Sequence, residues 1–179
     1  TLKGTTGDSA EKKLTAYGPG FRYNLYWSPD SRKLAFIDKA MKIYIYDRTT
    51  GQTTYIDHGL RMFEGNLQGF SPSWSPDSRW LAYDRDLPNN HRAVFIYDYT
   101  NKTLHQATSG YYSSANPAFD PGGKYLFITT SQSFNPLYSD LDNTFIYPNS
   151  TNLAAIVLKK TTRSPLYPKD DTVALQQEE

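Results

Sequence analysis

Residues 26–36, YWSPDSRKLAF, recur as SWSPDSRWLAY at residues 73–83 and, with more changes, as AFDPGGKYLFI at residues 118–128. The aromatic residues at the second position of the copies are 47 and then 45 residues apart. A period in this range, with strand-like content in each unit, is typical of stacked four-stranded β-sheets. The repeat therefore predicts an all-β fold, a partial β-propeller of about three four-stranded antiparallel blades.

Each copy contains a Pro-Asp or Pro-Gly turn between an extended segment and a short apolar strand. Pro29 favours the second position of such a turn, and Asp30 and Ser31 can hydrogen-bond to their own backbone to close it. The following residues, 42–47, alternate between Ile and Tyr with the period of two that marks a strand. The outer strands of the first two blades are then predicted at residues 53–57 and 103–108.

The repeats divide the chain into segments. Residues 11–15 resemble the outer strand of an earlier blade, and the chain begins at Thr1 rather than Met, so we expect a processed or excised piece. The acidic, polar end reads as a linker or disordered tail. The predicted segments are the end of a preceding blade (1–19), three blades (20–66, 67–113 and 114–163, the last with a long insertion at 129–152) and a linker or tail (164–179).

Composition excludes several classes of protein. The 179 residues include 19 basic and 18 acidic residues, for a net charge of +1, and no basic stripe that would suggest nucleic-acid binding. No apolar run approaches the length of a transmembrane helix, so we expect no membrane insertion. The absence of cysteine excludes disulfides and thiol catalysis but does not decide the compartment.

The residues with chemical potential are better explained by structure. His58, His91 and His105 fall on different predicted elements, and a metal site needs ligands that converge. Asp30 and Asp77 recur at one turn position, so a turn role explains them better than a pair of catalytic carboxylates. No Gly-x-Ser-x-Gly nucleophile motif is present. We expect no catalytic, cofactor-binding or metal-binding residue in this segment, and no cofactor.

Two further groups of residues also have a structural explanation. The aromatic residues Trp27, Trp74 and Phe119 recur in register, so packing between blades explains them better than a stacking site for carbohydrate or bases. A mixed group of charges lies around the second predicted strand of the second blade, and we interpret it as a solvated face: Arg79, Asp84, Arg85 and Asp86.

The insertion is the best candidate for a functional segment. Long loops outside the repeat are often functional or interfacial. It carries four aromatic residues that are candidates for contact with a substrate or with another domain: Phe134, Tyr138, Phe145 and Tyr147.

The WSPDS repeat followed by a YIYD strand at residues 44–47 resembles the blades of TolB-like and tricorn-type propellers. In the second half, FDPGGKYLF (119–127), SFNPLYSD (133–140) and SPLYP (164–168) follow in an order that resembles the end of the N-terminal propeller of bacterial tricorn protease homologues. The resemblance covers nearly the whole chain. It implies a noncatalytic part of a secreted or periplasmic bacterial peptidase whose PDZ-like and serine peptidase domains lie elsewhere.

Three functions remain open. The leading hypothesis is a scaffold or substrate-access and interaction module of a tricorn-like serine peptidase. The alternatives are a stand-alone TolB-like protein-interaction propeller and the propeller of a prolyl-oligopeptidase-type enzyme. The expected partners are the remaining domains of the same polypeptide, a peptide or unfolded-protein substrate and, through open blade faces, further copies of the chain.

Overall fold

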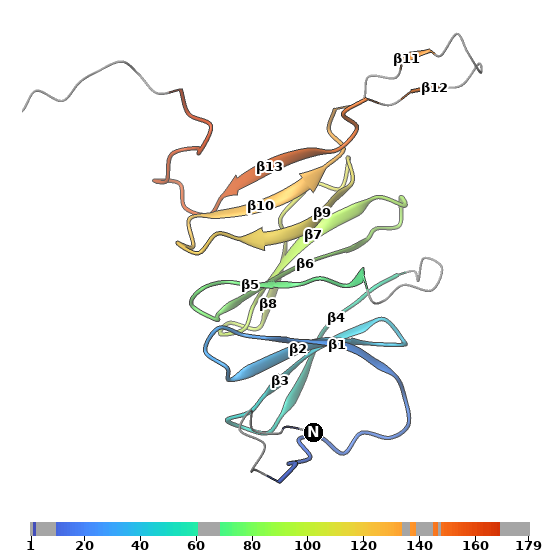
Figure 1. The fold of residues 1–179 in the computed structure, drawn as a ribbon, viewed down its shortest axis with the longest axis vertical. Helices are drawn as coiled ribbons and strands as arrows, with labels where there is room; N and C mark the ends of the chain where they lie inside the picture. The colour runs from blue at the N-terminus through green and yellow to red at the C-terminus, as the bar shows by residue number, and fades with distance from the viewer. Residues whose placement is uncertain are drawn as a thin grey trace, which may run out of the picture.

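The computed structural model describes residues 2, 10–60, 69–133, 137–138, 145–146 and 148–168. Three antiparallel sheets lie one above another, with the N-terminal sheet at the bottom of Figure 1. The sheets follow one another in sequence order, so each blade packs on its neighbour in the chain. We call the contact between blades one and two the first seam, and the contact between blades two and three the second seam.

Blades one and two each have four strands. In blade one the order is β1-β2-β3-β4, formed by Arg22–Trp27, Lys33–Asp38, Lys42–Asp47 and Thr53–His58. In blade two the order is β5-β6-β7-β8, formed by Ser73–Trp74, Trp80–Asp86, Arg92–Asp98 and Thr103–Gln106. The predicted all-β partial propeller is confirmed.

Blade three differs from the first two. Its described strands, in the order β9-β10-β13, are Ser114–Phe119, Tyr125–Thr130 and Asn152–Val157, so a fourth strand is not found among the described residues. Within the predicted insertion, β11 (Leu137–Tyr138) pairs with β12 (Phe145–Ile146). Across the described stretches, no helix is long and apolar enough to cross a membrane.

Two short side chains close the turn between the first two strands of blade one. Ser28 Oγ accepts a hydrogen bond from the N–H of Lys33 at 2.9 Å. Asp30 Oδ1 accepts another from the N–H two residues further on, at 3.0 Å. Ser75 and Asp77 form the same two bonds in blade two. The predicted turn role of both aspartates is confirmed.

Blade three closes this turn with one residue instead of two. Asp120 stands where the earlier copies have Ser28 and Ser75. Its carboxylate accepts hydrogen bonds from the N–H groups of Gly122, Lys124 and Tyr125. These N–H groups, that of Tyr125 first, lower the pKa of Asp120.

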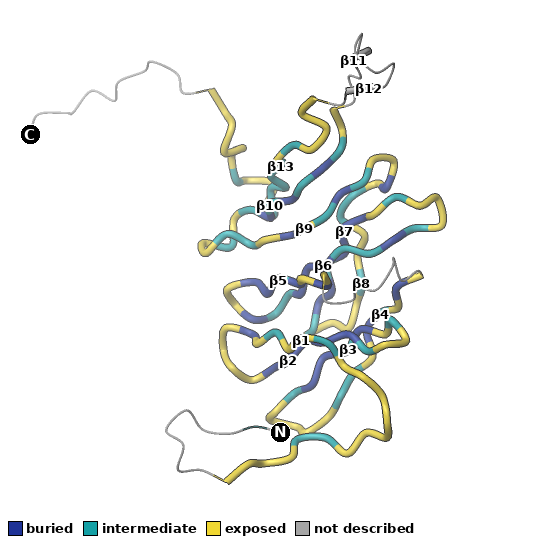
Figure 2. Tube along the Cα trace, turned by 45° about the vertical axis from the view of Figure 1, so that its right-hand side comes forward, coloured by how far each residue is buried: buried dark blue, intermediate teal, exposed yellow. Residues whose placement is uncertain are grey.

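The core lies in the two seams, because alternate residues of each middle strand face opposite neighbours. In β6, Leu81 and Tyr83 are fully buried against blade one, and Ala82 is fully buried against blade three. Leu126 and Ile128 of β10 face Ala82 across the second seam. Figure 2 shows the buried residues concentrated along the facing strands of the stack.

The open face of blade one carries the first aromatic residue of the repeat. Trp27 pairs with Leu34 as Trp74 pairs with Leu81, so the predicted equivalence of position is confirmed. Their burial differs, however: Trp74 is 9% exposed in the first seam and Trp27 is 41% exposed. In the described part of the chain no blade lies on that face, so the packing of Trp27 between blades stays a prediction.

The opening segment lies against this same face. Leu14 packs on the cluster of Leu34, Phe36 and Tyr46, and the Tyr17 ring lies 6.5 Å from that of Phe36. The described backbone pairing of residues 11–15 is a single bridge between Leu2 and Lys12, and their role as the outer strand of an earlier blade stays a prediction.

Candidate functional site

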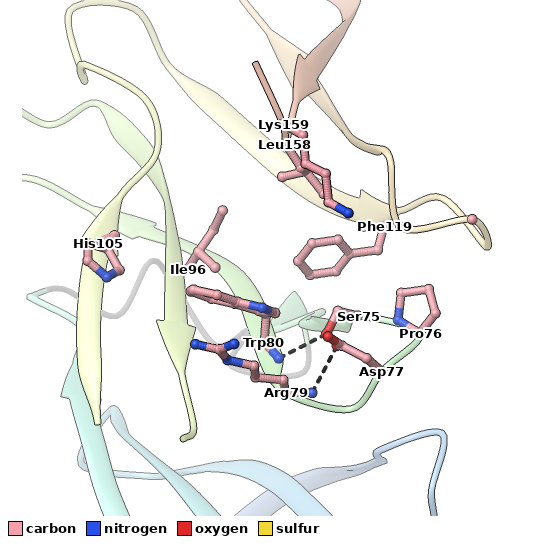
Figure 3. Close-up of a pocket in the computed structure, with 12 residues that line it drawn as sticks. Ser75, Pro76, Asp77, Arg79, Trp80, Ile96, His105, Phe119, Leu158 and Lys159 are labelled. Carbon is pink, nitrogen blue, oxygen red and sulfur yellow. Dashed lines mark hydrogen bonds between the residues drawn. The ribbon is translucent and has the colours of Figure 1, made fainter. Parts of the chain in front are cut away.

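A groove opens at the second seam, between the turn that begins β6 and the end of β13. Its volume is about 700 Å³. In Figure 3, Phe119, Leu158 and Lys159 lie on one side of the groove and Arg79 and Trp80 on the other. The lining residues are Ser75, Pro76, Asp77, Arg79, Trp80, Ile96, His105, Phe119, Gly122, Gly123, Leu158 and Lys159.

The repeat allows the second seam to be compared with the first, residue by residue. In each blade, the residue that follows the third strand donates a backbone hydrogen bond. The acceptor is the carbonyl oxygen of the residue that directly precedes the second strand. These pairs are Arg48 to Arg32, Tyr99 to Arg79 and Leu158 to Lys124. Tyr99 and Leu158 are therefore equivalent positions, and each belongs to the later blade of its seam.

The first seam is closed at this position by Tyr99. Its hydroxyl donates a hydrogen bond of 2.7 Å to Asp47 of blade one. Leu158 has no hydroxyl and a shorter side chain, so the equivalent bond is missing at the second seam. The residue of blade two that matches Asp47 is Asp98, and Arg79 of the same blade binds it instead.

The turn residue contributes a second difference. At the first seam, Ser78 Oγ accepts a hydrogen bond of 2.9 Å from the N–H of Asp30 in the neighbouring blade. Gly123 replaces this serine in blade three and has a φ of 63°, close to the 59° of Ser78. The backbone shape of the turn is therefore kept, while the side chain that would bridge the seam is absent.

The third difference is the residue at the start of the second strand. Lys33 is 8% exposed and lies in the first seam, with its ammonium 5.9 Å from the Trp74 ring centre and 5.3 Å from that of Tyr99. At the second seam the equivalent residue is Trp80, which faces the groove together with Phe119. Gly123 and Leu158 thus replace the residues that bridge the first seam, which explains why the groove is open at the second, and Trp80 lines it with an aromatic surface.

Arg79 orders the Trp80 side chain, which forms one side of the groove. Its guanidinium lies 4.7 Å from the centre of the Trp80 ring system and binds Asp98 through two hydrogen bonds, of 3.0 and 2.6 Å. Asp98 is 1% exposed, and the hydrogen bonds from Arg79 lower its pKa. The charge of Arg79 is thereby neutralised by a partner within its own blade.

The other charges that we interpreted as a solvated face are in fact within the seams, so that interpretation is wrong. Arg85 donates to Asp57 across the first seam at 2.6 Å, and Tyr83 donates to the same carboxylate at 2.8 Å. On the opposite face of β6, the Asp84 side chain is 6% exposed and pairs with Arg92. Burial raises the pKa of Asp84, although the charge of Arg92 opposes the shift.

The aromatic residues of the insertion remain candidates. Tyr138 and Phe145 pair in the β11–β12 hairpin, and their side chains are outside the described part. Phe134 and Tyr147 lie outside the described residues altogether. A role for these four residues in contact with a substrate or another domain stays a prediction.

The histidines are distributed over the molecule as their spacing predicts. His58 ends β4, His105 lies in β8, and His91 precedes β7, where its Nδ1 is 3.1 Å from the carbonyl oxygen of Gly110. In the described part of the chain, no group of three or more His, Cys, Asp or Glu side chains is placed to hold a metal ion.

The groove was not predicted from the sequence. Its signal was present in the third copy of the repeat, where Gly-Gly replaces Asp-Ser and the position of Tyr99 carries a leucine. These changes could not be interpreted from the sequence alone, because the contacts of Ser78 and Tyr99 across a seam become known only once the stacking of the blades is known.

Comparison with solved structures agrees with this architecture. The tricorn protease crystal structure superposes with a TM-score of 0.75 at 22% identity, over 97% of this chain and 17% of that one. TolB from Acinetobacter baumannii gives a TM-score of 0.51 at 19% identity, over 80% of this chain and 35% of that one. At these identities the likeness concerns the fold alone.

Comparison of sequences identifies the family. Tricorn protease homolog 1 of Streptomyces coelicolor is 26% identical over 166 residues, which are 93% of this chain and 15% of that protein. The chain therefore spans only a small part of the length of this relative. The model of the tricorn protease second beta propeller domain matches residues 2–179. The chain thus belongs to the family of the tricorn protease second beta propeller domain.

Proposed function

We propose that this chain is a noncatalytic wall of a tricorn-like serine peptidase, one that limits and guides the access of peptides or unfolded proteins to an active site elsewhere in the polypeptide. One observation carries this proposal. Trp27 and Trp74 occupy the same position of the repeat, but Trp74 is buried in the first seam, whereas Trp27 lies on the open face of blade one. Blade one thus has a face matched to a further blade, so the stack is suited to extension into a larger disc.

The physical role follows from rigidity. The seams join the blades through buried apolar clusters and through hydrogen bonds between them, such as the bond of 3.1 Å from Trp74 to Tyr26. A disc of such blades has a central channel and faces decorated by loops. It can sort substrates by size without supplying a proton or a nucleophile.

The setting of this role is part of the proposal. The peptidase domain, the peptide or unfolded substrate and a periplasmic or secreted location in a bacterium all derive from the resemblance to tricorn protease homologues. The two alternatives predict different sequences downstream of this chain. A TolB-like propeller would be followed by no peptidase domain, whereas a prolyl-oligopeptidase-type enzyme would be followed by a hydrolase domain with a nucleophile elbow.

The test uses the whole parent polypeptide with Trp27→Ala, and Trp27→Phe as the matched control. We expect Trp27→Ala to loosen the contact with the preceding blade and so to change the turnover of a long unfolded substrate, denatured casein. Turnover of a short fluorogenic peptide should stay the same in both variants. Equal changes for both substrates, or no change for casein, would contradict an access role, and a parent without peptidase activity would contradict the peptidase setting.

A further inference from the structure

We propose that the groove at the second seam binds the C-terminal end of a peptide, with an aromatic side chain between Trp80 and Phe119 and the terminal carboxylate at Lys159. This site goes beyond the proposed function, because binding here requires no peptidase domain. It is a recognition site on the propeller itself.

The walls of the groove favour a flat, apolar side chain. Trp80 and Phe119 are both half-buried and contribute aromatic surface from opposite sides, and Ile96 and Leu158 add aliphatic surface. Aromatic rings gain stabilisation from offset or edge-to-face contact with other rings. The groove, at about 700 Å³, is within the size range of sites that bury a small ligand.

Trp80 is held in place before any ligand binds. Arg79 stacks on its ring and is fixed by two hydrogen bonds to the buried Asp98. Binding to a wall that is already ordered costs less conformational entropy than binding to a mobile one. The first seam shows the alternative arrangement, in which Lys33 and Tyr99 occupy the space between the blades.

Charge defines the end of the ligand. Lys159 extends toward the groove and is exposed, and no ion pair of the described residues includes it. Arg79 is already paired with Asp98. Asp77, at the other end of the groove, accepts a hydrogen bond from the hydroxyl of Ser75, and its negative charge would repel a carboxylate of the ligand at that end. Lys159 is thus a cation that is available at one end of an apolar groove, and this arrangement fits one carboxylate next to one aromatic side chain. A C-terminal Phe or Tyr supplies both groups in a single residue.

The experiment measures binding of acetyl-Ala-Ala-Phe with a free C-terminal carboxylate to the full polypeptide, by calorimetry. We expect Lys159→Gln to weaken binding about tenfold, which corresponds to about 1.4 kcal/mol. Lys160→Gln, an exposed neighbour that does not line the groove, is the matched control and should bind like the wild type. The C-terminal amide of the same peptide should bind to the wild type more weakly than the free carboxylate does. Lys159→Gln should not weaken binding of this amide any further, because the interaction between Lys159 and the carboxylate is already lost.

A second variant blocks the groove without removing a charge. Leu158→Tyr installs the residue that the repeat has at Tyr99 and should abolish binding while the unfolding midpoint is retained. Binding that survives Leu158→Tyr, or that is equal for Lys159→Gln and wild type, would overturn the proposal.

Other ligands would give different results. Equal binding of acetyl-Ala-Phe-Glu-amide would show that an internal acidic side chain suffices, which would overturn the assignment of the terminal carboxylate. Absence of binding to the full polypeptide would also overturn it. Binding gained only when residues 169–179 are replaced by a Gly-Ser linker would identify the chain's own acidic segment as the occupant.

Discussion

The indole N–H of Trp74 donates a hydrogen bond of 3.1 Å to the carbonyl oxygen of Tyr26, and so ties the first strand of blade two to the first strand of blade one. The ring itself is buried in the cluster that fills the first seam. Trp27, the equivalent residue of blade one, has its ring near the guanidinium of Arg48 on an open face. The same residue of the repeat therefore has two energetic roles within one chain.

This difference predicts unequal costs of removing the two rings. Trp74→Ala should lower the free energy of unfolding by about 3–5 kcal/mol, because it leaves a cavity in the seam. Trp27→Ala should cost less than half as much in the 179-residue chain, because its ring is 41% exposed. Urea unfolding of the two variants measures both values. Equal losses would mean that the open face is covered in solution.

Two glycines with similar backbones form a second matched pair. Gly110 has a φ of 75° and Gly51 a φ of 70°, so an alanine is strained at both. A Cβ on Gly110 would lie 2.1 Å from Leu87 Cδ1, whereas nothing lies within 4 Å at Gly51. Gly110→Ala should therefore cost about 1–3 kcal/mol more than Gly51→Ala. Thermal unfolding of both variants tests this, and a larger loss for Gly51→Ala would contradict it.

Asp30 predicts a pH dependence of stability. Burial would raise the pKa of Asp30, but the hydrogen bond from Ser28 and the pair with Lys33 outweigh it and lower the pKa from 3.8 to about 2. A depressed pKa contributes stability that is fully present above the unfolded value of 3.8 and is lost as the pH falls through about 2. Asp30→Asn should flatten the stability curve between these values in urea titrations. An unchanged slope would show that neither the hydrogen bond from Ser28 nor the ion pair with Lys33 is formed in solution.

Arg85 and Asp57 predict a penalty for an unpaired buried charge. Their side chains are 19% and 11% exposed. Arg85→Met should destabilise the protein by about 3–5 kcal/mol, because it leaves the Asp57 carboxylate without its cation. Addition of Asp57→Asn should recover part of this loss, since the amide oxygen still accepts from Tyr83. Chemical denaturation of the single and double variants measures the effect, and a double variant less stable than Arg85→Met would contradict the explanation.

The outer faces of the stack predict self-association of the 179-residue chain. Leu153 on β13 is 73% exposed, and Leu25 and Trp27 on β1 are 59% and 41% exposed. Exposed apolar surface of this kind favours contact with another copy or another domain. Leu153→Glu together with Trp27→Glu should lower the mass seen by light scattering. A monomeric wild type would show that these faces do not associate.

The sequence by itself determined the blades and their turns. The 47-residue repeat places the strands, and Ser28 and Asp30 close their turn through partners only two to five residues away. Such local bonds need no knowledge of the rest of the fold, because short loops bring the partners together at small entropic cost. The role of the repeated aspartates could be predicted for the same reason.

Tertiary structure alone decided what the seams contain. Trp74 meets Tyr26 at a separation of 48 residues and Tyr99 meets Asp47 at 52, so their pairing depends on how the blades stack. From the sequence, Asp84 was interpreted as part of a solvated face, but its side chain is only 6% exposed, because the strand that carries it is covered on both faces. The groove likewise exists because Gly123 and Leu158 cannot bridge the second seam as Ser78 and Tyr99 bridge the first. That difference has a physical meaning only once the blades face each other.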